Sequence, residues 1–131
     1  MYRLIAAFTL LSIPAAQAAA PSVPVPSYWK DAGGSELSLH SIDAKGALTG
    51  TYIIHTAGFA CAGAPFDVQG KAHGSHLQFS VVWKSATADC KAHTSWYGHV
   101  TGKTIATWWM STTGAKRAAK KTRGTDTFAQ Q

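Results

Sequence analysis

Apolar and polar side chains alternate with a period of two in three separate stretches of the chain, 79–83, 94–98 and 105–109. Successive side chains of a β-strand point to opposite faces, so each stretch is predicted to be a strand. Trp83, Trp96 and Trp109 then fall on corresponding faces of their strands. On neighbouring strands of one closed sheet, three such indoles would line a single cavity suited to a flat heterocyclic ligand.

The same kind of pattern continues through the chain after Pro26, where glycine and small polar residues interrupt it about every 8–12 residues. Eight strands are predicted, at 28–31, 36–42, 48–55, 66–71, 76–85, 91–101, 104–112 and 121–129. Short connections between them predict antiparallel neighbours. The predicted fold class is therefore all-β, an eight-stranded antiparallel up-and-down β-barrel that can hold one small ligand.

The opposite faces of these strands carry unusually large apolar side chains. If the three indoles point inward, then Val82, Tyr97, Trp108 and Met110 point outward. A contiguous exposed apolar patch indicates a subunit interface, so a homodimer or homotetramer is predicted through this outer face. The alternative is that these are scattered apolar residues of an ordinary surface.

The N-terminus has the pattern of a secretory signal. Arg3 precedes a short apolar run, 4–13, and the small residues of 16–18 form a cleavage pattern. Residues 1–18 are predicted to be a signal peptide and 19–27 a proline-rich leader, with the domain at 28–131 and a secreted or periplasmic location. A buried N-terminal helix is the alternative. No other segment is apolar enough to cross a membrane.

The chain has two cysteines, Cys61 and Cys90, each expected in one of the longer connections. In an oxidising compartment the default is one disulfide. It would close a loop of about 30 residues and contribute about 3–4 kcal/mol. A catalytic thiol is the weaker interpretation, because no activating residue accompanies either cysteine.

The net charge is +6, and the cations cluster at Lys116, Arg117, Lys120, Lys121 and Arg123. This cluster contains no aromatic residue, which argues against single-stranded nucleic acid as a partner and favours a solvated hairpin. The histidines lack the spacing and acidic partner of a zinc site. No metal, no cofactor and no catalytic site are predicted, and the protein is expected not to be an enzyme.

Six ordered blocks form a recognisable pattern: Trp29 with 34–35, then 46–52, 79–84, 94–98, 105–109 and 124–128. This pattern resembles the avidin/streptavidin family of biotin-binding proteins, and the paired cysteines resemble its disulfide-containing bacterial members, which include dimers. They extend over nearly all of the predicted domain. The resemblance implies a secreted, high-affinity, non-covalent biotin-binding protein with one biotin per chain in the open end of the barrel.

The resemblance also implies the roles of individual residues. Ser35 and Tyr52 match donors to the ureido oxygen of biotin, and Asp126 matches an acceptor for one ureido N–H. Trp83, Trp96 and Trp109 match the aromatic walls, and Thr94 matches a residue near the thiophane sulfur. Phe79 is a further expected ligand-binding residue. Taken singly, Tyr52, Ser35 and Asp126 would each also suit a purely structural role in a strand or turn.

The chain departs from the family pattern at several positions. Asp31 replaces an asparagine that donates to the ureido oxygen, and an ionised carboxylate can only accept. Either that contact is lost, or Asp31 and Asp126 lie close enough for Asp31 to stay protonated and donate. Ile54 and Ala92 replace small polar ligand contacts, so fewer hydrogen bonds are expected.

A further departure concerns the cover of the pocket. Ala118 stands where tetrameric relatives lend a capping tryptophan to a neighbour, and Phe59 is a candidate lid from within the chain. The expected biological consequence is vitamin sequestration. The alternative functions are an avidin-like barrel that binds another small hydrophobic ligand or acts as a protein inhibitor.

Overall fold

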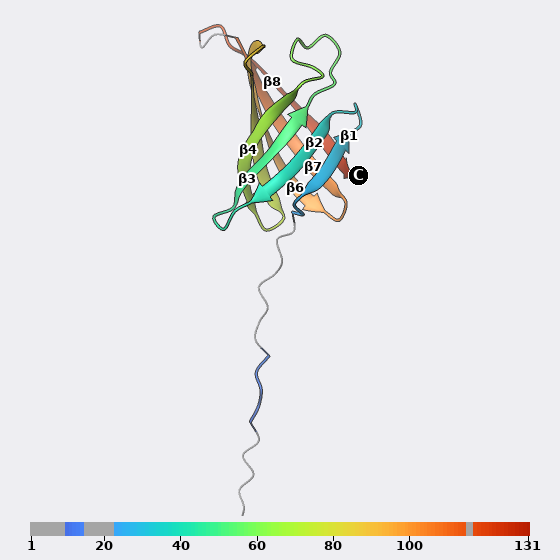
Figure 1. Ribbon diagram of the computed structural model, residues 1–131, viewed down its shortest axis with the longest axis vertical. Helices are drawn as coiled ribbons and strands as arrows, with labels where there is room; N and C mark the ends of the chain where they lie inside the picture. The colour runs from blue at the N-terminus through green and yellow to red at the C-terminus, as the bar shows by residue number, and fades with distance from the viewer. Residues whose placement is uncertain (1–9, 15–22, 115–116) are drawn as a thin grey trace, which may run out of the picture.

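The computed structural model describes residues 10–14, 23–114 and 117–131, and its folded part is one closed barrel of eight antiparallel strands in sequence order (Figure 1). The strands are β1 (Ser27–Asp31), β2 (Glu36–Ile42), β3 (Ala47–Ile53), β4 (Pro65–His73), β5 (His76–Lys84), β6 (Asp89–Thr101), β7 (Thr104–Thr113) and β8 (Lys120–Gln130). β1 pairs with β8 and closes the sheet. The predicted fold class is confirmed.

The strand ends differ from the prediction by a few residues, and one difference moves a cysteine from a loop onto a strand. Asp89 pairs with Lys84, so β6 begins two residues earlier than expected and contains Cys90. Cys90 was expected in a loop; it lies on a strand instead. The register shifts between Val82 and Lys84, and Lys91 adopts a positive φ of 48°. Such irregularities at a barrel rim redirect a strand without ending its pairing.

The closed end of the barrel contains the hydrophobic core. Alternate residues point inward, as in β5, where Phe79, Val81 and Trp83 are at most 1% exposed. Each fully buried large apolar side chain contributes about 1.5–3 kcal/mol relative to exposure. Val23 is also buried, so the predicted proline-rich leader is partly packed against the core.

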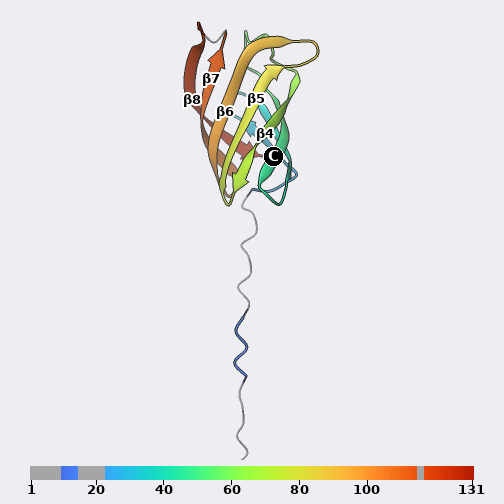
Figure 2. The ribbon, with the colours of Figure 1, turned by 90° about the vertical axis from the view of Figure 1, so that its left-hand side faces the viewer.

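Four connections lie at the other end of the barrel, opposite the N-terminal segment: the β1–β2 turn, the β3–β4 loop, the β5–β6 connection and the β7–β8 hairpin (Figures 1 and 2). Most of the predicted signal peptide, 1–9 and 15–18, lies outside the described residues, as does Lys116 of the cationic cluster. In the part of the chain that the structure describes, no helix is long and apolar enough to span a membrane.

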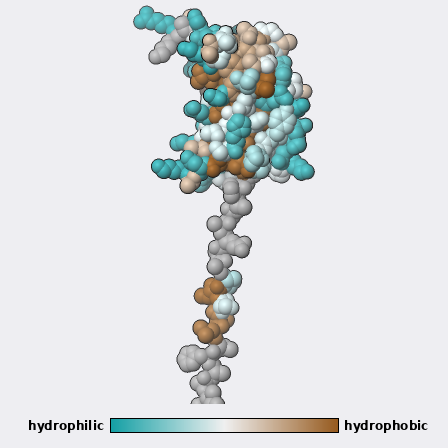
Figure 3. Space-filling model, viewed as in Figure 1, coloured by the Kyte–Doolittle hydropathy of each residue, from teal (hydrophilic) through white to brown (hydrophobic). Residues whose placement is uncertain are grey.

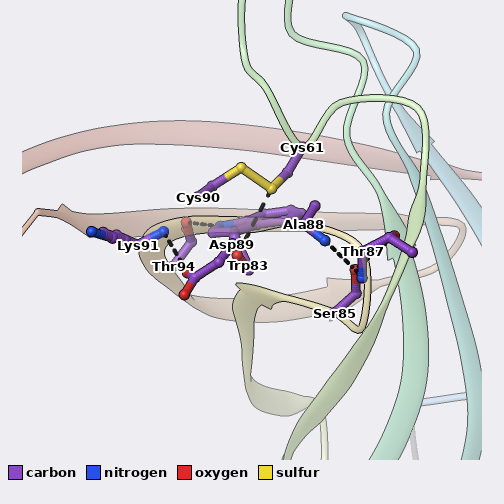
Figure 4. Close-up of a disulfide and its surroundings, with 9 residues drawn as sticks. All are labelled: Cys61, Trp83, Ser85, Thr87, Ala88, Asp89, Cys90, Lys91 and Thr94. Atoms are coloured by element: carbon purple, nitrogen blue, oxygen red, sulfur yellow. Dashed lines mark hydrogen bonds between the residues drawn. A yellow bond between two sulfur atoms is a disulfide. The ribbon is translucent and has the colours of Figure 1, made fainter.

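A disulfide joins Cys61 of the β3–β4 loop to Cys90 of β6, with the two Cα atoms 6.2 Å apart (Figure 4). Cys61 is buried, and its sulfur lies 3.8 Å from the carbonyl oxygen of Trp83. The bridge therefore fastens the longest loop of the open end beside one of the three inward-facing indoles.

Replacing both Cys61 and Cys90 by alanine is expected to lower the free energy of unfolding by about 3–4 kcal/mol, because the unfolded chain regains the entropy of a loop spanning a sequence separation of 29 residues. Guanidinium unfolding followed by tryptophan fluorescence measures the loss. A reductant should shift the midpoint of the natural sequence and leave that of the double variant unchanged. Equal unfolding midpoints for the two proteins would contradict the expectation.

Candidate functional site

The open end of the barrel contains a cavity of about 490 Å³. This volume is in the range of small-molecule sites. Nine of the eleven predicted ligand residues line it: Asp31, Ser35, Tyr52, Ile54, Trp83, Thr94, Trp96, Trp109 and Asp126. They come from six strands and two loops, so the cavity depends on closure of the barrel.

Aromatic side chains form the floor of the cavity in two layers. Tyr52 and Trp96 lie with ring centroids 4.8 Å apart, and Trp83 meets Tyr52 edge-on at 5.9 Å. Phe79 stacks on Trp96 at 4.9 Å with an interplanar angle of 12°. Phe79, predicted as a ligand-binding residue, is completely buried and does not line the cavity, so it supports the floor from below.

Trp109 forms one side wall, and a glycine on the next strand makes room for it. Gly124 pairs directly with Trp109 across β7 and β8. A Cβ atom at Gly124 would lie 2.4 Å from the Trp109 ring, well inside van der Waals contact. Any larger residue at this position would therefore displace the indole.

Ser35 is fixed from three directions at the polar corner of the cavity. Its backbone N–H donates to Asp31 Oδ1 at 2.9 Å, and its carbonyl oxygen accepts from the Asp31 N–H at 3.0 Å. The His55 N–H donates to Ser35 Oγ at 3.0 Å. Since this oxygen already accepts a bond, the hydroxyl proton of Ser35 is left to donate into the cavity.

An outer network holds the backbone that orients Ser35. The imidazole Nε2 of His55 lies 3.0 Å from Glu36 Oε2, and the Tyr28 hydroxyl donates to the other oxygen of Glu36. These bonds lower the pKa of Glu36, the Tyr28 bond most and the His55 bond next. The His55 residue borders the cavity, and its imidazole engages this outer carboxylate.

Asp31 has a structural role that the sequence analysis missed. Its Oδ1 accepts the Ser35 N–H and thereby caps the β1–β2 turn. The closeness of two carboxyl groups that the sequence analysis considered has its effect at Asp126, whose pKa is raised. Burial raises it first, and the nearby Asp31 carboxylate raises it further.

Two further polar groups of the floor, the Tyr52 hydroxyl and the Trp96 N–H, lie near the same carboxylates. Burial, followed by Asp31 and Asp126, raises the pKa of Tyr52 far above its usual value, so the phenol remains a donor at physiological pH. The buried Trp96 Nε1 has no well-formed hydrogen bond among the described residues. Its N–H nevertheless faces Asp126 closely enough to oppose the rise in the pKa of that carboxyl.

Thr94 belongs to a hydrogen-bond relay along the wall. The Trp83 indole N–H donates to Thr94 Oγ1 at 2.9 Å, and Thr94 Oγ1 lies 2.9 Å from Ser111 Oγ. Ser111 donates to the carbonyl oxygen of His93 at 3.3 Å. The proton between Thr94 and Ser111 therefore belongs to Thr94, which leaves that threonine with lone-pair capacity toward a ligand and no free proton.

The structure also differs from the predicted set at its edges. Ala92 is buried in the core and does not border the cavity. Phe59, the predicted lid, does border it and meets Trp83 edge-on at 5.3 Å. Sequence analysis missed the hydroxyls of Ser111, Thr113 and Thr122, although alternation from Trp109 and Asp126 along β7 and β8 places them on the inner face.

The comparisons with known proteins agree with this geometry. The model of the Avidin family matches residues 20–131. Afifavidin of Afifella pfennigii is 33% identical over 120 residues, which cover 88% of this chain and 75% of afifavidin.

Two solved structures extend the comparison. A rhizavidin–biotin complex has a TM-score of 0.75 and 26% identity, covering 82% of this chain and 92% of rhizavidin. A low-affinity mutant of shwanavidin, with alanine in place of one phenylalanine, has a TM-score of 0.74 and 33% identity, covering 83% of this chain and 96% of that one. With the barrel, the disulfide and the polar corner in place, this chain belongs to the avidin family of non-enzymatic biotin-binding proteins.

Proposed function

We propose that this chain is an exported protein that binds one biotin molecule non-covalently in the open end of its barrel. The observation that carries the proposal is the polar corner, where Ser35, Tyr52 and Asp126 meet above an aromatic floor. Two neutral donors beside one carboxylate acceptor complement a ureido group, which presents one oxygen and two N–H groups.

In this proposal each group of biotin has its own part of the cavity. The Ser35 and Tyr52 hydroxyls donate to the ureido oxygen, and Asp126 accepts a ureido N–H. Trp83, Trp96 and Trp109 enclose the fused rings. A ligand that lacked the ureido group would leave these buried polar groups unpaired, so the site discriminates strongly in favour of ureido compounds.

Fewer polar contacts are available than in the family pattern. Ile54 borders the cavity and offers no side-chain acceptor for the second ureido N–H. Each missing neutral hydrogen bond costs about 0.5–1.5 kcal/mol of affinity. The affinity is therefore reduced at this end without being abolished, because the aromatic enclosure and three polar contacts remain.

Phe59 is the proposed lid of the occupied site. It lies in the loop that the disulfide holds beside Trp83, and it contacts that indole edge-on. The phenylalanine-to-alanine substitution in the low-affinity shwanavidin mutant supports the importance of a phenylalanine in this family. The exposed Ala118 of the β7–β8 hairpin provides no aromatic cover.

Self-association is proposed through the outer face of β6 and β7. Tyr97 and Trp108 stack at 4.4 Å with an interplanar angle of 17°, although 39% and 49% of their surfaces are exposed. Met110 continues this surface, whereas Val82 is separated from it by the hydrogen-bonded pair Ser80–Ser95. A second copy of the chain is the proposed occupant, because exposed stacked aromatic side chains are typical interface anchors.

Titration of the mature protein with biotin is expected to quench tryptophan fluorescence and to saturate at one biotin per chain. Ser35→Ala and Tyr52→Phe should each weaken binding by about two- to twelvefold, since each removes one neutral donor. Calorimetry gives the number of sites and the affinities. An absence of binding at micromolar biotin would contradict the proposal and favour another hydrophobic ligand or a protein partner for the barrel.

Asp126→Asn is expected to weaken biotin binding by about tenfold to 150-fold, because a charge-assisted hydrogen bond is lost. The same variant should stabilise the ligand-free protein near pH 7. The raised pKa of Asp126 means that the folded state favours its protonated form, so its stabilising contribution is present below about pH 3.9 and is lost as the pH rises through the raised pKa.

Thermal melting of both proteins across pH 3–8 tests this sign. The stability advantage of Asp126→Asn should disappear at the acidic end of the series. A variant that is less stable than the natural sequence near pH 7 would mean that ionised Asp126 is favourable in the fold.

Trp108→Lys is expected to convert an oligomer to a monomer, because it places a charge in the middle of the proposed interface. Val82→Lys is the matched control, since Val82 is 64% exposed and lies beyond the Ser80–Ser95 pair. Light scattering coupled to size exclusion gives the mass of each. A monomeric natural protein, or dissociation by the control alone, would refute this assignment of the interface.

A further inference from the structure

The wall of the cavity changes character along β7 and β8 toward the mouth. On β7 the inward-facing residues are Trp109, Ser111 and Thr113. On β8 the inward-facing Thr122 lies two residues before Gly124. Indole gives way to hydroxyl groups at the level where the tail of a bound ligand would leave the barrel. The mouth is therefore suited to a polar ligand terminus.

Lys120 occupies the next position of the same face. It pairs directly with Thr113, just as Thr122 pairs with Ser111. Directly paired residues of an antiparallel sheet share a face, with Cβ atoms about 4.5–5.5 Å apart. Lys120 is exposed and lies beyond the residues that line the cavity, as expected for a side chain on the collar of the opening.

Its neighbour Lys121 lies on the other face. Lys121 pairs with Thr112, and Thr112 borders an outer cleft together with Gly114 and Ala119. Hydrophilic side chains gather at this hairpin, at the upper left of the molecule in the view of Figure 3. Among the three cations of β8, the alternation of the strand thus places Lys120 on the inner face and Lys121 and Arg123 on the outer face.

We propose that Lys120 is a specificity residue that favours ligands whose protruding tail ends in a free carboxylate over ligands whose tail is neutral. The inference rests on the proposed function, because the ligand must bind with its ring system at the floor. A lysine ammonium is a mobile point charge on a flexible stem, so it can follow a carboxylate at the mouth without a fixed geometry. Thr113 and Thr122 offer hydroxyl donors beside it.

The consequence is selection between two forms of the same vitamin. Free biotin carries a carboxylate at the end of its tail, whereas biotin joined to a protein through an amide has lost that charge. Lys120 stabilises the first form and not the second. The site is thereby biased toward capture of the free vitamin.

The test is direct competition between biotin and biotinamide, which differ in tail charge and share the ring system. Limiting protein is equilibrated with both, and the unbound ligands are counted by mass spectrometry, so the ratio of affinities is obtained whatever their absolute values. Lys120→Gln should reduce the preference for biotin by about two- to fivefold at low salt, the range expected for an exposed ion pair. Lys120→Glu should reduce it further.

Lys121→Gln and Lys121→Glu are the matched controls, because they change the same net charge on the outer face. The preference of the natural sequence should also fall in high salt, whereas that of Lys120→Gln should change little. An unaltered ratio in both Lys120 variants, or an equal loss in the Lys121 variants, would overturn the assignment to Lys120 while leaving biotin binding intact. If the natural sequence bound neither compound, the proposed function would fail together with this inference.

Discussion

Closure of the sheet is the constraint on which the remaining structure depends. In a closed barrel every strand is paired along both edges, so half of the side chains must share one interior. The interior is divided by an aromatic layer. Phe79 stacks beneath Trp96 and meets Phe128 edge-on, and Tyr52 lies above them. Below this layer the space is filled by buried apolar side chains, and above it the same alternation leaves a cavity.

Bringing the groups of the polar corner together costs electrostatic free energy. Two carboxylates and a buried phenol face one another, and burial and mutual repulsion raise the pKa of Asp126 and that of Tyr52. Asp31 illustrates how the turn limits the choices. An asparagine there could accept the Ser35 N–H through its oxygen and donate to a ligand through its nitrogen. An aspartate keeps the first function, which the turn requires, and in its ionised form gives up the second.

The fold could be predicted from the sequence because its determinants are local. Period-two alternation, short glycine-containing turns and the number of strands together specify an up-and-down barrel, and inward-facing Trp83 and Trp96 follow from the alternation. The site was less predictable, because side chains on one face can lie at different depths. Phe79 supports the floor and Ala92 is covered by other core residues, although both share a face with residues of the cavity.

The alternation of polar and apolar residues likewise could not predict the extra pairing of Asp89 or the capping role of Asp31. Both depend on how the backbone turns at a rim, and alternation carries no information about that. The same alternation places inner and outer aromatic side chains next to each other along the chain. Trp96 and Tyr97 are successive residues of β6, and Trp109 follows Trp108 on β7, with Trp96 paired to Trp109 and Tyr97 to Trp108. Whatever packs on the outer aromatic pair restrains the very backbone that positions the inner pair. The proposed interface and the cavity therefore share two strands, because each of the paired indoles Trp96 and Trp109 has its chain neighbour on the outer face.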